Sequence, residues 1–207
     1  MTDKAMTDKV VTDYSAMNDD AFRAEVRAYF EKEYPPNLRF MARRLRWVEI
    51  RDWYLTLSRK GWIAPNWPRE YGGMGLSPQK MIIFLEEIER WGIARAPDHG
   101  IVQVGPILIR FGSDKQRQEY LPKILSGEYV FCQGYSEPNA GSDLASLRTS
   151  AVRDGDHFVL NGQKIWTTLA QESTHMYILV RTDSKVKKQE GISFMLLDMK
   201  TPGVTVR

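Results

Sequence analysis

The chain has 207 residues, 43% of them hydrophobic and 27% charged, with a formal net charge of +3. This size allows one large domain or two small ones, and the mild charge gives no indication of a nucleic-acid or membrane-surface partner. Cys132 is the single cysteine, which excludes an internal disulfide and indicates a reducing compartment. His99, His157 and His175 are too widely spaced to predict a metal site.

The N-terminal segment, residues 1–17, carries acidic residues and has no apolar core. We expect a disordered tail that is neither a signal peptide nor a typical transit peptide. No apolar run in the chain approaches the ~20 residues that span a bilayer. The sequence therefore predicts a cytoplasmic protein without a membrane span.

The next part of the chain reads as helical, and we expect an α-helical domain over residues 18–127. Pro35-Pro36 ends the first helix, and Gly61 stands where a left-handed C-terminal cap belongs. Adjacent helical residues point ~100° apart, so the acidic pair Glu86-Glu87 is expected on a solvated face. Apolar residues recur at helical spacing over residues 18–34, 43–60, 79–91 and 100–111.

A fifth helix is expected after Gly112. Ser113 and Gln116 match a capping box at its start, and Pro122 predicts a break or a fresh helical turn near Leu121. Gly127 then closes the helical half of the chain.

The remaining residues, 128–207, predict a β-domain. Asp154-Gly155 and Asn161-Gly162 are hairpin-type turn signals between short strand-like runs. The fold class is therefore α+β, an all-α bundle followed by an antiparallel β-barrel or sandwich. Because the last run reaches the end of the chain, we expect this domain to be truncated. The expected strands cover residues 129–133, 148–153, 157–160, 163–169, 175–181, 191–199 and 204–206.

One stretch within this β-domain is an apolar run that breaks into a loop of small polar residues, over residues 131–143. Ser136 and Ser142 provide hydroxyls there, and Gly141 allows a backbone to approach a ligand closely. A second stretch, residues 161–168, is a turn followed by a strand-like run.

The second stretch ends on an indole and two hydroxyls, from Trp166, Thr167 and Thr168. Together the two stretches suit a flat aromatic ligand that carries phosphates. On composition alone, without the exact residue order, the two stretches also fit a hairpin with a buried Trp and a Ser-rich turn.

The exact residue order favours the ligand-binding site over the buried-Trp hairpin. Ser-Glu-Pro-Asn-Ala-Gly-Ser-Asp, followed by Asn-Gly-Gln-Lys-Ile-Trp-Thr-Thr, closely resembles the flavin-binding segments of the acyl-CoA dehydrogenase family. The resemblance covers the chain from about residue 18 to the end. It implies a helical domain and a β-domain, followed in the family by a third, helical domain that this chain lacks.

The resemblance assigns FAD as the cofactor and implies the roles of individual residues. Ser136 would bond the pyrimidine edge of the ring, and Ser142 would lie at the FAD pyrophosphate and the bound acyl-CoA substrate. Trp166 would cover one ring face, and Thr168 would donate near N5, which gains charge on reduction. The residues implied to contact FAD are Gln133, Tyr135, Ser136, Gly141, Ser142, Trp166, Thr167 and Thr168.

The pair Tyr135-Ser136 stands where the family more often has Val-Thr or Leu-Thr, and Ser136 keeps the hydroxyl. The wording resembles bacterial branches that act on dicarboxylic or sterol side-chain thioesters.

The implied reaction is α,β-dehydrogenation of an acyl-CoA to the trans-2-enoyl-CoA, in fatty acid and lipid metabolism, with electron-transferring flavoprotein as the acceptor. The catalytic Glu of the family falls after residue 207, so we assign no catalytic residue, and Glu137 belongs to a structural turn. An oligomer is expected, usually a homotetramer in the family. The alternatives are a non-catalytic subunit of a heteromeric enzyme, an acyl-CoA oxidase, or a plain structural module.

Overall fold

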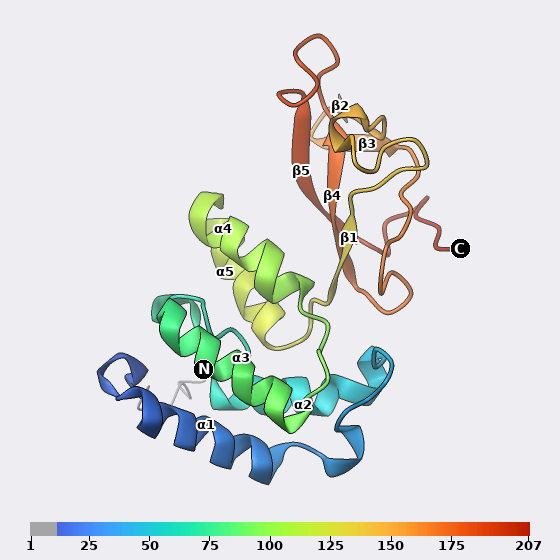
Figure 1. Ribbon diagram of the computed structural model, residues 1–207. Helices are drawn as coiled ribbons and strands as arrows, with labels where there is room; N and C mark the ends of the chain where they lie inside the picture. The colour runs from blue at the N-terminus through green and yellow to red at the C-terminus, as the bar shows by residue number, and fades with distance from the viewer. Residues whose placement is uncertain (1–11) are drawn as a thin grey trace, which may run out of the picture.

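A computed structural model describes residues 12–207, in which a group of helices lies below a five-stranded sheet (Figure 1). The helices α4 and α5 lie between the other helices and the sheet. The α-helices are α1 (Asp19–Glu33), α2 (Trp47–Lys60), α3 (Pro78–Trp91), α4 (Gly105–Phe111) and α5 (Asp114–Leu125). The strands are β1 (Phe131–Gly134), β2 (Ser150–Asp154), β3 (His157–Asn161), β4 (His175–Arg181) and β5 (Ile192–Asp198).

Local signals explain most helix ends. Gly61 has φ 81° after α2, as its position predicts. Ser113 and Gln116 form the expected capping box of α5, because Ser113 N donates to Gln116 Oε1 at 2.9 Å and Gln116 N donates to Ser113 Oγ at 3.3 Å. The expected break at Pro122 is wrong: α5 continues to Leu125, since buried Leu121 and Ile124 hold its last turns. The second helix starts at Trp47, later than residue 43.

The fourth expected helix begins with a turn of π-helix, Gly100–Val104. Gly105 N donates to Gly100 O, five residues back, so the Ile101 carbonyl loses its α-helical donor. The next residue, Pro106, has no N–H to offer instead. The indole N–H of Trp67 fills the gap by donating to Ile101 O at 2.7 Å.

The helical core is rich in aromatic rings, and it includes a residue of the expected tail. Tyr14 lies in a short 3₁₀ helix, Tyr14–Ala16, and is buried against Phe22 and Trp62. Trp62 Nε1 donates to the Tyr14 hydroxyl at 3.0 Å. Within the expected tail, Tyr14 and Met17 therefore pack on the helical core, and residues 1–11 lie outside the described residues.

The prediction of a solvated acidic pair is wrong for one of its members. Glu86 is exposed, but Glu87 is only 1% exposed and accepts hydrogen bonds from three arginines. Arg23 and Arg27 come from α1, and Arg90 follows Glu87 on α3. Glu87 therefore joins α1 to α3 through charge-assisted hydrogen bonds.

The sheet is mixed and is not a closed barrel, which corrects the expected antiparallel barrel or sandwich. Its order is β1-β4-β2-β3, with β5 paired to β4. The β2–β3 hairpin and the β4–β5 pair are antiparallel, whereas β1 and β2 run parallel to β4. Parallel pairing of β1 and β4 needs a long crossover, and residues 135–174 provide it. Asp154-Gly155 is confirmed as the turn of the β2–β3 hairpin, whereas the hairpin expected at Asn161-Gly162 is wrong, because no strand follows it directly. Neither turn signal carries information on this crossover.

Two expected strands are absent from the described residues. Residues 163–169 form an irregular segment and a turn, because Trp166 has φ 57° and Leu169 has φ 70°, values outside the β region. Residues 204–206 also form no strand.

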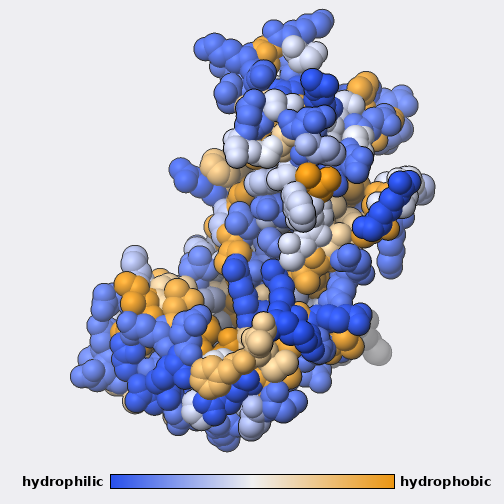
Figure 2. All heavy atoms as spheres, turned by 45° about the vertical axis from the view of Figure 1, so that its right-hand side comes forward, coloured by the Kyte–Doolittle hydropathy of each residue, from blue (hydrophilic) through white to orange (hydrophobic). Residues whose placement is uncertain are grey.

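The helices and the sheet share a core. Phe131 of β1 and Tyr177 of β4 pack with residues of the π-helix, α4 and α5, such as Ile101 and Ile124. Hydrophilic residues cover most of the face in Figure 2, with smaller areas of hydrophobic residues between them. No helix within residues 12–207 has the length and apolar character that crossing a bilayer requires.

Candidate functional site

The two stretches singled out in the sequence lie side by side in the structure. Ile165 N donates to Ser136 O at 2.9 Å, which joins the second stretch to the first. The Lys164 ammonium donates to Tyr135 O at 3.1 Å and to Glu137 Oε1 at 2.8 Å. Residues that lie 27 to 29 positions apart in the sequence therefore form one local unit.

Glu137 is the centre of that unit. Glu137 as a whole residue is 8% exposed, and the side chain of its partner Lys164 is 6% exposed. The backbone N–H groups of Arg148 and Thr149 also donate to the Glu137 carboxylate, at 2.7 and 2.9 Å. Burial alone would raise the pKa of Glu137, but the hydrogen bonds from Lys164 and these N–H groups outweigh it and hold the pKa at about 2. A carboxylate so fully bonded is a poor proton acceptor, which fits a structural role.

The first stretch provides β1 and the loop after it. Gln133 Nε2 donates to the Tyr177 hydroxyl at 2.8 Å, and the Tyr135 ring meets the Tyr177 ring edge-on, so both half-buried side chains face the helices. Beyond the tight turn at Glu137, Gly141 and Ser142 are exposed. A Cβ added at Gly141 would meet nothing within 4 Å, so the fold itself does not require glycine there.

The second stretch presents an indole to solvent. Trp166 is 87% exposed, with its backbone in the left-handed region. Thr168 N donates to Trp166 O at 2.9 Å, which closes a tight turn around Thr167. The buried-Trp alternative of the sequence analysis is therefore wrong.

Four serine and threonine hydroxyls of the two stretches are free to bond a ligand. Within residues 12–207 they take part in no hydrogen bond, and they belong to Ser136, Ser142, Thr167 and Thr168. Free hydroxyls, an exposed indole and a glycine with open space around it are the groups that a flat, phosphate-bearing ligand requires. The residues present fit FAD on this ground.

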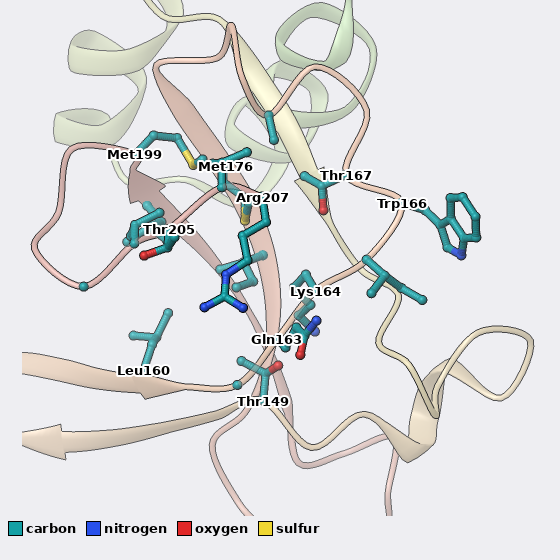
Figure 3. A pocket seen from close by; sticks show the side chains of 18 of the residues that line it. Thr149, Leu160, Gln163, Lys164, Trp166, Thr167, Met176, Met199, Thr205 and Arg207 are labelled. Carbon is teal, nitrogen blue, oxygen red and sulfur yellow. The ribbon is translucent and has the colours of Figure 1, made fainter.

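A cavity of about 780 Å³ lies beside the second stretch and is bounded by the sheet and the last residues of the chain. Trp166 and Thr167 border it, but the Trp166 ring points away from it in Figure 3. The other expected site residues lie outside it. Apolar side chains from the sheet form much of its wall, including Leu160, Met176, Ile178, Leu197 and Met199.

Sequence reasoning missed the Lys164–Glu137 pair as the feature that holds the site together. Both residues were visible in the motifs, but nothing in their spacing of 27 positions indicated contact. The part of the chain that the structure describes contains no cluster of three or more His, Cys, Asp or Glu able to hold a metal ion.

Two protein-family models match the chain. The model described as "Acyl-CoA dehydrogenase, N-terminal domain" matches residues 17–128, and "Acyl-CoA dehydrogenase, middle domain" matches residues 132–207. The chain therefore belongs to the acyl-CoA dehydrogenase family.

Individual relatives agree with this assignment. Acyl-CoA dehydrogenase FadE29 of Mycobacterium tuberculosis is 41% identical over 182 residues, which cover 87% of this chain and 47% of that protein. The Tcur3481-Tcur3483 steroid ACAD matches with a TM-score of 0.80 and 39% identity, over 89% of this chain and 48% of the other. A glutaryl-CoA dehydrogenase of Mycobacterium smegmatis in complex with FADH2 matches with a TM-score of 0.67 and 25% identity, over 92% and 48% of the two chains. The chain thus spans about half the length of these relatives.

Proposed function

We propose that this chain provides the flavin-binding segments of an FAD-dependent acyl-CoA dehydrogenase, which converts an acyl-CoA to the trans-2-enoyl-CoA. One observation carries the proposal: the buried Lys164–Glu137 pair joins the two motif segments, so that an exposed indole and free hydroxyls belong to one unit. The complex of the similar glutaryl-CoA dehydrogenase with FADH2 supports the choice of cofactor.

Each residue of this unit has a proposed task. Trp166 offers an indole face for stacking on the isoalloxazine, and Thr168 offers a hydroxyl near the N5 edge. Ser136 offers a hydroxyl to the pyrimidine edge, and Ser142 with Gly141 borders the pyrophosphate and the acyl-CoA. Gln133, Tyr135 and Thr167 complete the lining. When bound, FAD supplies the hydride acceptor.

The catalytic base is proposed to lie outside residues 1–207, because Glu137 is ionised and fully bonded. An electron-transferring flavoprotein is the proposed electron acceptor, and the cytoplasm the proposed location. The proposed assembly is a dimer or tetramer.

A non-catalytic role within a heteromeric dehydrogenase is a second candidate. The steroid ACAD that resembles this chain carries two component names, Tcur3481 and Tcur3483. A flavin-free subunit would contradict the first proposal and support this one.

FAD binding by the full-length protein separates the two candidates. We expect a co-eluting flavin spectrum, and a Kd for FAD raised about tenfold in Trp166→Leu, since one aromatic stacking contact is lost. Phe111→Leu is the matched control, because Phe111 is a 73% exposed ring on α4, and its FAD affinity should equal that of the wild type. A folded, colourless full-length protein that takes up no FAD would refute the dehydrogenase proposal.

A further inference from the structure

The loop that carries Trp166 and Thr168 has anchors in both domains. At its start, Ile165 bonds Ser136 within the β-domain. Near its far end, Thr174 N donates to Val130 O within the β-domain, and Glu172 accepts from the backbone N–H of Trp47, the first residue of α2 in the helical domain.

Glu172 accepts two charge-assisted hydrogen bonds, one on each carboxylate oxygen. Arg46 Nε donates to Glu172 Oε1 at 2.6 Å, and Trp47 N donates to Oε2 at 2.5 Å. Trp47 is the first residue of α2, so its N–H has no partner within the helix. The hydrogen bond from Arg46 is the main cause that lowers the pKa of Glu172 below its ordinary value. The loop therefore supplies a capping carboxylate to a helix of the other domain.

The loop needs this anchor because its own backbone is unfavourable. Trp166 and Leu169 both occupy the left-handed region, which side chains other than glycine adopt at a cost. Such conformations persist only where the surrounding structure holds them. The hydrogen bonds within the loop are short-range. Thr168 N donates to Trp166 O, and Ala170 N donates to Thr167 O. Leu169 O accepts from the backbone N–H groups of Glu172 and Ser173 and from the Ser173 hydroxyl.

We propose that Glu172 is a positioning residue, which sets the loop of Trp166 and Thr168 by tying it to the start of α2. The proposal rests on the proposed flavin site for its functional consequence, though not for the contact itself. The helical domain thereby contributes to flavin binding through the contact of Arg46 and Trp47 with Glu172, and none of these three is among the residues proposed to contact FAD.

The decisive comparison uses two carboxylates at the same helix start. Glu49 also accepts a backbone N–H, from Arg46 at 2.8 Å, and pairs with the Arg43 guanidinium. Glu49 stays within the helical domain, whereas Glu172 bridges to the loop. Glu172→Gln and Glu49→Gln thus disturb the same end of α2, but only the first releases the loop.

Hydrogen exchange of the flavin-free, full-length protein tests the anchor directly. For the amides of residues 166–172 we expect exchange about tenfold faster in Glu172→Gln, as expected for one lost charge-assisted hydrogen bond, and unchanged in Glu49→Gln. Equal protection of these amides in the two variants would overturn the proposal.

Flavin affinity gives the functional readout on the same variants. We expect the Kd for FAD to rise about tenfold in Glu172→Gln and to stay at the wild-type value in Glu49→Gln. Faster exchange with unchanged affinity would overturn the positioning role. Failure of the wild type to bind FAD would instead overturn the proposed function, and the exchange result would still decide whether Glu172 holds the loop.

Discussion

Each domain contains a buried glutamate, Glu87 in the helical domain and Glu137 in the β-domain, and the two are bonded differently. Glu87 in the helical domain accepts from Arg23, Arg27 and Arg90, whose side chains are between 33% and 44% exposed. Glu137 in the β-domain accepts from Lys164, which is itself buried, and from two backbone N–H groups. The first is a buried anion with solvated partners, and the second is a buried pair.

The two glutamates also differ in what each of them holds in place. Removing Glu87 loosens two helices that an extensive aromatic core also holds. Glu137 and Lys164 instead fix the relative position of the two motif segments, and burial lowers the pKa of Lys164. A buried pair is costly to form, and it is strongly destabilising to break because one charge is left without its partner.

The largest expected effect follows from breaking that pair. Lys164→Met leaves the Glu137 carboxylate buried with only backbone donors, and we expect a loss of about 3–5 kcal/mol in the free energy of unfolding. Urea denaturation of the full-length protein measures it. The control Lys187→Met changes an exposed lysine at 83% exposure, and should cost under about 0.5 kcal/mol. The double variant Lys164→Met/Glu137→Gln should recover part of the loss; if it is as unstable as the two single losses summed, the two groups do not act as a pair.

A smaller loss is expected in the helical domain. Glu87→Gln keeps the shape and some hydrogen bonds but removes the charge among three arginines, so we expect about 1–3 kcal/mol. Because the arginines remain solvated, this loss should be smaller than that of Lys164→Met. The neighbouring Glu86→Gln is the matched control, since Glu86 is exposed and pairs with Arg23 alone, and it should cost under about 0.5 kcal/mol. Equal losses at the two positions would show that burial of Glu87 has no energetic consequence.

The contrast between Glu86 and Glu87 also shows where sequence reasoning stops. The helix itself was predictable from its apolar spacing, as were the cap at Gly61 and the capping box at Ser113. Those signals are local. Which of two adjacent glutamates is buried depends on the arginines of α1, more than 50 positions away, and no local pattern contains that information.

The same limit applies to the site. The motif wording identified the family, yet residues 163–169 were expected as a strand because their β-branched and aromatic side chains favour one. Tertiary anchors at Lys164 and Glu172 override that preference and turn Trp166 outward. The anchors could not be predicted, since each joins segments far apart in the chain.

The smallest expected effect is the difference between the pKa values of Glu87 and Glu137, which should be near zero. At both positions burial would raise the pKa, and hydrogen bonds outweigh it: from the arginines at Glu87, and from Lys164 and the N–H groups at Glu137. Both values fall from 4.5 to about 2. In each case the stabilisation is complete above the unfolded value of 4.5 and is lost as the pH falls towards 2.

Between these limits the unfolded state binds a proton that the native state does not, so each group steepens the rise of unfolding free energy with pH by up to about 1.4 kcal/mol per unit. Urea denaturation between pH 3 and 4 should therefore show the same reduced slope in Glu137→Gln and Glu87→Gln, within about 0.3 kcal/mol per unit. Equal slopes with unequal losses at pH 7 would mean that either set of hydrogen-bond donors lowers the pKa of its carboxylate equally well. Exposure of the partners would then set only the cost of disruption. A distinctly steeper pH dependence of the unfolding free energy in one variant would contradict this. It would show that solvated arginines and a buried lysine lower the pKa of a carboxylate by different amounts.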